Sequence, residues 1–300
     1  MKDDRIAVLL GGGMGKMICV TALLPKMQEK YGDIILVNPY PEVFMYNPHL
    51  YRNLTYHEKY LYEDYVQDVN VISGEPYLTK EYRFERKHLI EAYCKVFDLE
   101  YSATTLPEIY LSPEEETFGQ GHASQGDYIL MHVTGGTSYY SPQNANNKPV
   151  KSRDWDIPIA QEFVTAFKKK YPNIRVVQVA LQTEPQLKDV IVTNLPSRMI
   201  FPLVKYAKTF VSIDGFVGHV SAAFNKKGVV LWGGTDPKRL SYPHNTNMVL
   251  DYKCSLPFCH KTDFYSHLGG KEMSCRHKYP CMQHDPNVVL DAVSKIIEAK

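Results

Sequence analysis

The sequence predicts an α/β protein built from two doubly wound, Rossmann-like domains that face a cleft. Apolar runs suited to buried parallel strands alternate with Gly-rich turns and amphipathic helices near the start of the chain, and this alternation restarts after residue 126. The chain has 300 residues, 44% of them apolar, so it can bury two cores. We expect domains over 1–120 and 121–285, and a C-terminal helix over 286–300 that can pack back on the first domain.

The first domain opens in the order strand, Gly-rich turn, helix, strand, which is the order of a parallel α/β unit. We expect its strands at 5–10, 33–37 and 69–72 and its helices at 17–30 and 86–97. The pattern weakens between residues 40 and 110, where 12 of the 22 tyrosines lie. The polar, acidic stretch 112–126 is typical of a linker.

The second domain repeats the α/β pattern. We expect strands at 128–133, 174–180, 210–213 and 229–232 and helices at 159–170, 202–208 and 286–299. Ligands of open parallel sheets gather beyond the carboxyl ends of the strands. Functional residues should therefore lie just after strands.

Charge and composition limit the partners and the compartment. The net charge is only +1, so no overall charge draws the chain to nucleic acid or anionic lipid. No run approaches the roughly 18 to 20 apolar residues that span a bilayer, and we expect a cytoplasmic protein without a transmembrane anchor. Six cysteines in a reducing compartment are not expected to form a disulfide framework.

The first Gly-rich turn, Gly11 to Lys16, does not match two familiar nucleotide motifs. A P-loop would need Gly and a hydroxyl residue where Leu10 and Met17 stand, and the dinucleotide fingerprint would need Gly at Lys16. The backbone of Gly13 and Gly15 can still approach a ligand closely at a helix N-terminus. The alternative is a tight turn with no ligand.

Similar turns follow three strands of the second domain. Their residues are Thr134, Gly135, Gly136 and Thr137 after the first, Asp214, Gly215 and His219 after the third, and Gly233, Gly234 and Thr235 after the fourth. Backbone amides and hydroxyls of this kind can cradle a phosphate. A flexible loop, a helix-capping Asp and a core His would explain them without a ligand.

Four stretches resemble one enzyme family. "SIDGFVGHVSAAFNKKGVVLWGGTDP", followed by Pro243-His244, is similar to the donor-site signature of the heptosyltransferase-like glycosyltransferases, family 9. "GGGMGKMICVTALLPKMQEKYG", "KSRDWDIPIAQEFVTAFKKKYP" and "CMQHDPNVVLDAVSKII" resemble its opening, its Trp-bearing middle and its end. The resemblance implies a GT-B fold with the sugar-nucleotide donor on the C-terminal domain and the acceptor on the N-terminal one.

The resemblance implies a glycosyltransferase that moves a heptose-like or other sugar from a nucleotide-sugar donor to an acceptor hydroxyl with inversion. Amides, hydroxyls and a cation must stabilise the charge that gathers on the leaving diphosphate. The donor-binding residues that we expect are Gly13, Gly15, Thr134, Gly135, Gly136, Thr137, Lys151, Gln182, Asp214, Gly215, His219, Gly233, Gly234 and Thr235.

The general base is the main departure from the family. Family members often carry a catalytic Asp where this chain has Lys16, and a lysine is a poor base but a good phosphate or acceptor contact. A carboxylate from elsewhere must then deprotonate the acceptor hydroxyl. Asp64 and Glu85 are the candidates, and Glu75 is also available.

Four of the six cysteines, Cys254, Cys259, Cys275 and Cys281, fall within 28 residues. Such clustering suggests thiolate coordination of a structural zinc or iron ion, and some protein-modifying heptosyltransferases that the chain resembles carry iron on C-terminal cysteines. Free thiols are the alternative. No catalytic metal is expected.

Two other functions stay open. Without a base at Lys16 the chain could be a non-catalytic sugar-nucleotide binding protein. The Tyr-rich segment with Arg83, Arg86, Lys87 and His88 could instead hold modified DNA as the acceptor, in place of a glycan or a protein. A homo-oligomer is compatible with either function.

Overall fold

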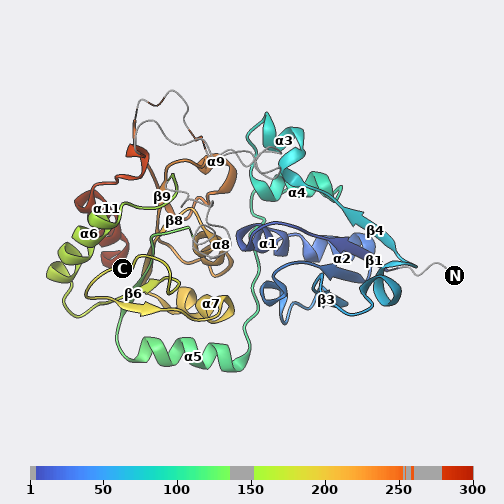
Figure 1. Cartoon of the computed structure of the whole chain (residues 1–300), viewed down its shortest axis with the longest axis horizontal. Helices are drawn as coiled ribbons and strands as arrows, with labels where there is room; N and C mark the ends of the chain where they lie inside the picture. The colour runs from blue at the N-terminus through green and yellow to red at the C-terminus, as the bar shows by residue number, and fades with distance from the viewer. Residues whose placement is uncertain (1–4, 136–151, 253, 255–257, 260–278, 300) are drawn as a thin grey trace. The chain divides into compact units, whose positions relative to one another are not determined.

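The computed structural model describes residues 5–135, 152–252, 254, 258, 259 and 279–299 (Figure 1). The chain divides into two compact units, Met1–Ser112 and Pro113–Lys300, and each has its own parallel sheet. Both sheets agree with the predicted α/β class.

Four parallel strands form the sheet of the first unit, in the order β3-β2-β1-β4. Their bounds are Ile6–Leu9 (β1), Ile34–Val37 (β2), Arg52–Leu54 (β3) and Asn70–Ser73 (β4). β1 and β2 are apolar and almost wholly buried, as strands covered on both faces must be.

Short helices connect these strands. They are Met14–Thr21 (α1), Leu24–Tyr31 (α2), Pro41–Phe44 (η1), Tyr62–Val66 (η2), Pro76–Leu78 (η3), Lys80–Arg83 (α3) and Leu89–Val96 (α4). The prediction of one helix over 17–30 was wrong, because α1 ends at Thr21 and α2 begins three residues later. Pro25 lies in the first turn of α2, where its missing N–H costs nothing, and a single continuous helix could not accept it as easily.

Six parallel strands form the sheet of the second unit, in the order β10-β9-β8-β5-β6-β7. Their bounds are Tyr128–His132 (β5), Arg175–Val179 (β6), Ile191–Thr193 (β7), Thr209–Ile213 (β8), Val229–Trp232 (β9) and Thr246–Val249 (β10). Counted within the unit, the order is 3-2-1-4-5-6 read from β7, that of a doubly wound Rossmann sheet.

Helices cover both faces of this sheet. Their bounds are Pro113–Ser124 (α5), Ile157–Lys170 (α6), Ser197–Tyr206 (α7), Phe216–Ala223 (α8), Pro237–Leu240 (α9), Pro280–Met282 (η5) and Pro286–Glu298 (α11). α6 and α11 lie side by side in Figure 1, and Val289 and Val293 of α11 belong to the core of this unit with Phe163 and Phe167 of α6. α7 and α8 lie against each other, and Tyr128 of β5 donates to the Leu203 carbonyl of α7.

The prediction of a linker over 112–126 was wrong, since most of this stretch is α5. Three glutamates, Glu114 to Glu116, occupy its first turn, where the helix dipole favours negative charge. Its Gly119 packs so closely on α7 that a Cβ there would lie 2.4 Å from the Tyr206 ring. A polar sequence can be helical when one narrow side is held this closely by a neighbour.

Among the helices in the described ranges, none combines the length and the apolar character needed to cross a bilayer.

Candidate functional site

The sheet of the second unit reverses its strand order between β5 and β8. The loops after these two neighbouring strands leave in opposite directions, and the crevice between them is where doubly wound sheets bind ligands. Thr134 and Gly135 follow β5, and Asp214 and Gly215 follow β8. The predicted donor residues that the structure describes here therefore share one edge of the sheet.

Arg153 holds the end of β8. Its Nη2 donates to the Asp214 carbonyl at 2.6 Å, and its Nε lies 3.3 Å from the Asp214 carboxylate. The side chain of Asp214 is 7% exposed and that of Arg153 is 23% exposed. Arg153 is therefore a partly exposed cation at the crevice, and the residue list from the sequence did not include it.

The residue after Arg153 fixes the loop that follows β5. The Gly135 N–H donates to Asp154 Oδ1 at 2.7 Å, so this amide is already used by the protein. Glu184, in the loop after β6, accepts from the Leu181 N–H at 2.6 Å. Burial raises the pKa of the Glu184 carboxyl, and the Leu181 N–H and the Thr134 hydroxyl oppose this shift. The loops after β5 and β6 thus bring a hydroxyl and a buried carboxyl together.

Two buried histidines flank Asp214. Burial lowers the pKa of both His132 and His219 to about 4, so both rings are neutral at pH 7. His219 Nδ1 lies 2.9 Å from the Tyr242 hydroxyl, and His132 meets the edge of the Phe216 ring at a centroid distance of 5.4 Å. Neither ring therefore adds positive charge at this edge of the sheet.

The turn after β9 is closely packed and contains one buried hydroxyl without a described hydrogen-bond partner. The Gly234 N–H donates to the Ser152 carbonyl at 2.7 Å, and a Cβ on Gly233 would lie 2.3 Å from Met282 Sδ. Both glycines are thus required for close packing. Thr235 is 3% exposed, and its Oγ1 has no hydrogen-bond partner in the part of the chain that the structure describes.

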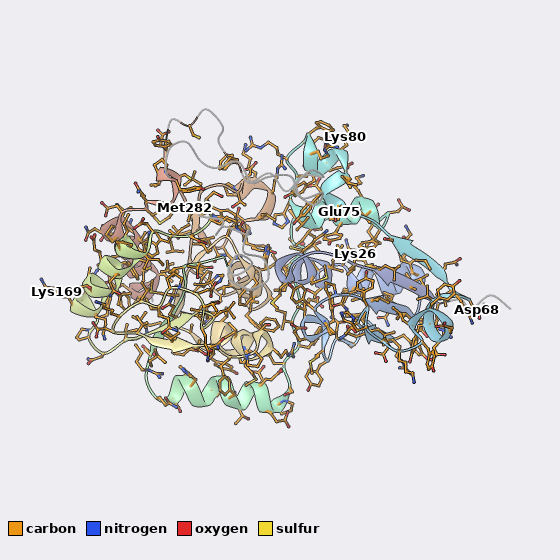
Figure 2. The ribbon with its side chains drawn as sticks, viewed as in Figure 1. Lys26, Asp68, Glu75, Lys80, Lys169 and Met282 are labelled. Atoms are coloured by element: carbon orange, nitrogen blue, oxygen red, sulfur yellow. The ribbon has the colours of Figure 1, made fainter. Side chains whose placement is uncertain are left out.

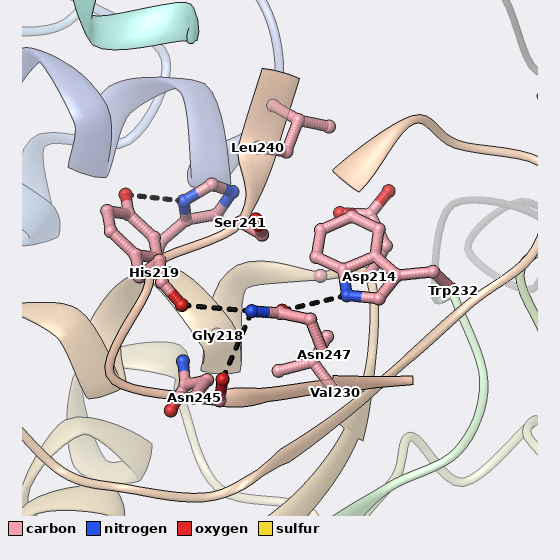
Figure 3. A pocket seen from close by; sticks show the side chains of 11 residues that line it. Asp214, Gly218, His219, Val230, Trp232, Leu240, Ser241, Asn245 and Asn247 are labelled. Carbon is pink, nitrogen blue, oxygen red and sulfur yellow. Dashed lines mark hydrogen bonds between the residues drawn. The ribbon is translucent and has the colours of Figure 1, made fainter. Parts of the chain in front are cut away.

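A pocket opens beside this turn, between the start of α8 and the strands β9 and β10 (Figure 3). Asp214, Gly218, His219, Trp232 and Asn247 are among the residues that line it. The Asn247 amide is bound internally, because its Oδ1 accepts from Trp232 Nε1 at 2.9 Å and its Nδ2 donates to the Tyr242 carbonyl at 3.0 Å. The polar wall of the pocket is therefore fixed in place.

The first unit has its own cluster at the Gly-rich turn. Lys16, on α1, forms an ion pair with Glu75, whose carboxylate oxygen is 2.6 Å from its Nζ (Glu75 is labelled in Figure 2). Gly13 caps α1, and a Cβ there would meet no atom within 4 Å, so its surface is open; Gly15 lies inside α1. Asp64 is an exposed residue of η2.

Glu85 forms an ion pair with Lys80 at 2.7 Å, and this contact lowers the pKa of its carboxyl. It is thus a weaker base than an unpaired glutamate. Gln182 is exposed in the loop after β6.

Gly136, Thr137, Lys151 and Cys275 lie outside the described residues. In the ranges that are described, no three His, Cys, Asp or Glu side chains are grouped so as to hold a metal ion. Cys254, Cys259 and Cys281 are within those ranges, so these three do not form a site with each other.

No family model matches the sequence, and no curated protein matches it. In its fold the chain matches the GT-B glycosyltransferases, as the resemblance to family 9 implied. A glycosyl transferase family 9 structure from Veillonella parvula superposes with a TM-score of 0.68 at 14% identity, covering 99% of this chain and 98% of that one.

Two Escherichia coli enzymes are also similar. The ADP-heptose LPS heptosyltransferase II gives a TM-score of 0.65 at 14% identity, with 98% of each chain covered. TibC, an iron-containing dodecameric glycosyltransferase from an enterotoxigenic strain, gives 0.65 at 11% identity, covering 97% of this chain and 76% of that chain. At these identities the likeness establishes the fold.

Proposed function

We propose that this protein is a glycosyltransferase that moves a sugar from a nucleotide-sugar donor to an acceptor hydroxyl with inversion. The observation that carries the proposal is the gathering of polar residues at the point where the second sheet reverses its strand order. Thr134 and Arg153 belong to the connection after β5, Asp214 to the loop after β8 and Thr235 to the turn after β9, so all four follow strands at this edge. Arg153 pairs with Asp214, which lines a pocket. An edge of this kind suits a nucleotide.

The chemistry of the donor matches these side chains. The leaving nucleotide diphosphate gains negative charge in the transition state, and a positioned cation and hydroxyls stabilise that charge. Arg153 supplies the cation, and Thr235 supplies a hydroxyl that no described protein group uses. The neutral His219 and the carboxylate of Glu184 can bind sugar hydroxyls.

The first donor to test is ADP-heptose, because TibC has been solved in complex with ADP-D-beta-D-heptose. UDP- and GDP-sugars form the rest of the panel. Mass spectrometry of candidate glycan, protein and DNA acceptors after incubation reports the transferred sugar. A protein that retains a donor without any transfer to an acceptor or to water would instead be a binding protein, the alternative that Lys16 at the usual Asp position favours.

Two threonines in the second unit separate donor binding from folding. Thr235→Val removes a hydroxyl without a described partner, so we expect the melting temperature to hold and nucleotide affinity to fall about fivefold, by about 1 kcal/mol. Thr209→Val is the control, because Thr209 Oγ1 donates to the Lys227 carbonyl within the fold. It should lower stability and leave affinity unchanged. Calorimetric titration with ADP and the donor panel measures the affinity of each variant, and its melting temperature measures stability. An unchanged affinity for Thr235→Val would contradict the proposed donor site.

A further inference from the structure

The sheet of the first unit also reverses its strand order, between β1 and β4. β1 is followed by the Gly-rich turn and α1, and β4 is followed by Gly74 and Glu75. The crevice at the carboxyl ends of these two strands is the expected ligand site of this sheet, by the same rule that applies to the second unit. Lys16 and Glu75 meet at this point from the two loops.

The ion pair between Lys16 and Glu75 is short and uses both oxygens of the carboxylate. Lys16 Nζ donates to Glu75 Oε1 at 2.7 Å and to Oε2 at 2.6 Å, and the Tyr77 N–H donates to Oε1 at 3.1 Å. The Tyr77 ring covers the ammonium at 4.6 Å from its centroid. The Lys16 side chain is 4% exposed, whereas that of Glu75 is 31% exposed. The carboxylate is thus the part of the pair that an outside molecule can reach.

The backbone on both sides is shaped for this pair. Gly12 has a φ of 108°, a conformation that favours glycine, and a Cβ there would lie 2.6 Å from Lys16 Cδ. On the other side, a Cβ on Gly74 would lie 2.5 Å from Val96 Cγ1 of α4. Because Gly12 has no Cβ, the aliphatic part of the Lys16 side chain can pack against the turn. Because Gly74 has none, the loop that carries Glu75 can pack against α4.

The carboxylate keeps capacity for another hydrogen bond. An ionised carboxylate offers about four acceptor positions, and the three bonds above use two on Oε1 and one on Oε2. Burial lowers the pKa of Lys16, while the bond to Glu75 opposes this shift and supports the charged form. Tyr93 on α4 is also nearby, and burial raises its pKa well above the usual value, so it stays neutral.

An aromatic ring lies beside the same turn. The Tyr56 hydroxyl donates to the Leu10 carbonyl at 2.8 Å, which ties the loop after β3 to the start of the Gly-rich turn. Tyr56 is 46% exposed, so part of its ring faces solvent. A half-exposed tyrosine is suited to stacking on a sugar ring of an acceptor.

We propose that Glu75 is the general base of the transfer reaction and that Lys16 is its positioning residue. This inference rests on the proposed function. The acceptor O–H bond breaks and its proton goes to Glu75 Oε2. The acceptor oxygen forms the bond to the anomeric carbon, and the bond from that carbon to the nucleotide diphosphate breaks, with its electron pair leaving on the diphosphate.

Position, rather than intrinsic basicity, separates Glu75 from the two carboxylates that the sequence suggested first. Asp64 lies on η2, whose residues Tyr65 and Val66 pack on the sheet face, and Glu85 is held by Lys80 on a surface turn. Neither belongs to a loop that directly follows β1 or β4. The ion pair between Glu75 and Lys16 also explains how a lysine can stand at the usual Asp position in a working enzyme.

The test uses the full chain and release of nucleotide from ADP-, UDP- and GDP-sugars, with water as the acceptor, followed across pH. Glu75→Gln should lower the rate at least about 100-fold and remove the acid limb of the pH profile, without changing the affinity for the free nucleotide. Glu75→Asp should restore part of the rate. Lys16→Met should cost about tenfold, mainly in kcat, and should keep the acid limb because the base remains.

The control is Asp98→Asn, which breaks a Lys30 ion pair of the same 2.6 Å length elsewhere in the first unit and should leave the rate within about twofold. A Glu75→Gln protein that melts like the wild type and keeps both its rate and its acid limb would overturn the assignment and leave the proposed function intact. A wild-type protein that binds nucleotide but transfers the sugar neither to water nor to any glycan, protein or DNA acceptor of the panel would overturn both, as would one that binds no nucleotide.

Discussion

Buried, neutral histidines make the stability of the folded chain depend on pH. Burial lowers the pKa of His132, His219 and His284 to about 4 in the folded chain. The unfolded value is about 6.5. Between these two values the unfolded chain binds protons that the folded chain excludes. The free energy of unfolding therefore falls as pH drops through this window, and the full stability is present only above about pH 6.5.

We expect each histidine to contribute up to about 1.4 kcal/mol per pH unit in this window. His132→Asn should reduce the slope, whatever it costs at pH 7.5, because the folded chain then excludes one proton fewer. Urea unfolding at pH 7.5, 6.0 and 5.0 measures the slope. His57→Asn, at an exposed position, is the control and should leave it unchanged. A slope that does not change for His132→Asn would mean that other groups dominate.

A buried ion pair fixes α5 to α7 at the scale of secondary structure. Arg198 Nε lies 2.6 Å from Glu115 Oε1 and its Nη2 lies 2.7 Å from Oε2, and the two side chains are only 7% and 10% exposed. This bidentate ion pair attaches α5, a helix of low hydrophobicity, to α7. It also explains why a stretch with the composition of a linker is helical.

Glu115→Gln should destabilise the chain by about 3 to 5 kcal/mol, because it leaves the Arg198 cation buried without its counter-charge. Asp127→Asn is the matched control, since its Lys208 partner is at 2.8 Å and the Asp127 side chain is 58% exposed. The exposed pair should contribute at most about 1 kcal/mol. Chemical denaturation monitored by circular dichroism compares the two. Equal losses would argue against the buried pair as the main anchor of α5.

Strands in the interior of each sheet could be predicted, whereas three of the four edge strands could not; the exception is the edge strand β4, expected at 69–72 and found at Asn70–Ser73. β1, β5, β8 and β9 are runs of mostly apolar residues covered on both faces, so the sequence alone predicts them closely. β3, β7 and β10 have three or four residues, some of them exposed, and read RNL, IVT and TNMV. Runs so short and mixed carry no clear period, and their pairing with a neighbouring strand decides their structure.

The candidate site shows a similar difference: residues that follow recognisable strands could be predicted, and residues that depend on a distant partner could not. The turns at Thr134, Asp214 and Thr235 were predicted because they follow recognisable strands. Arg153 and Glu75 could not be ranked from the sequence, because each is paired with a residue distant along the chain. For Glu75 that partner is Lys16, 59 positions away. Only the strand order brings such residues together.

The metal prediction concerns the composition of the whole molecule. Zinc or iron held by Cys254, Cys259, Cys275 and Cys281 would be structural, and thiolates need such an ion to offset their charge in a reducing compartment. Elemental analysis of protein purified under reducing conditions should then give about one equivalent of either metal per chain. Cys254→Ser should lower both the metal content and the melting temperature, while Cys94→Ser, in a buried apolar setting, should leave the metal content unchanged. A content below about a tenth of an equivalent would remove the hypothesis.

The strand order of the two sheets also bears on how the protein reaches its native state during translation. All four strands of the first sheet lie before residue 74, so that sheet can assemble as soon as this part has left the ribosome. The second sheet cannot follow the same schedule. β5 lies at its centre beside β8, and the residues that pair across them are 80 positions apart, as His132 and Ser212 are. The apolar strand β5 therefore stays unpaired on its β8 side until β8 has been synthesised. During this interval the nascent protein is most exposed to aggregation and most needs a chaperone.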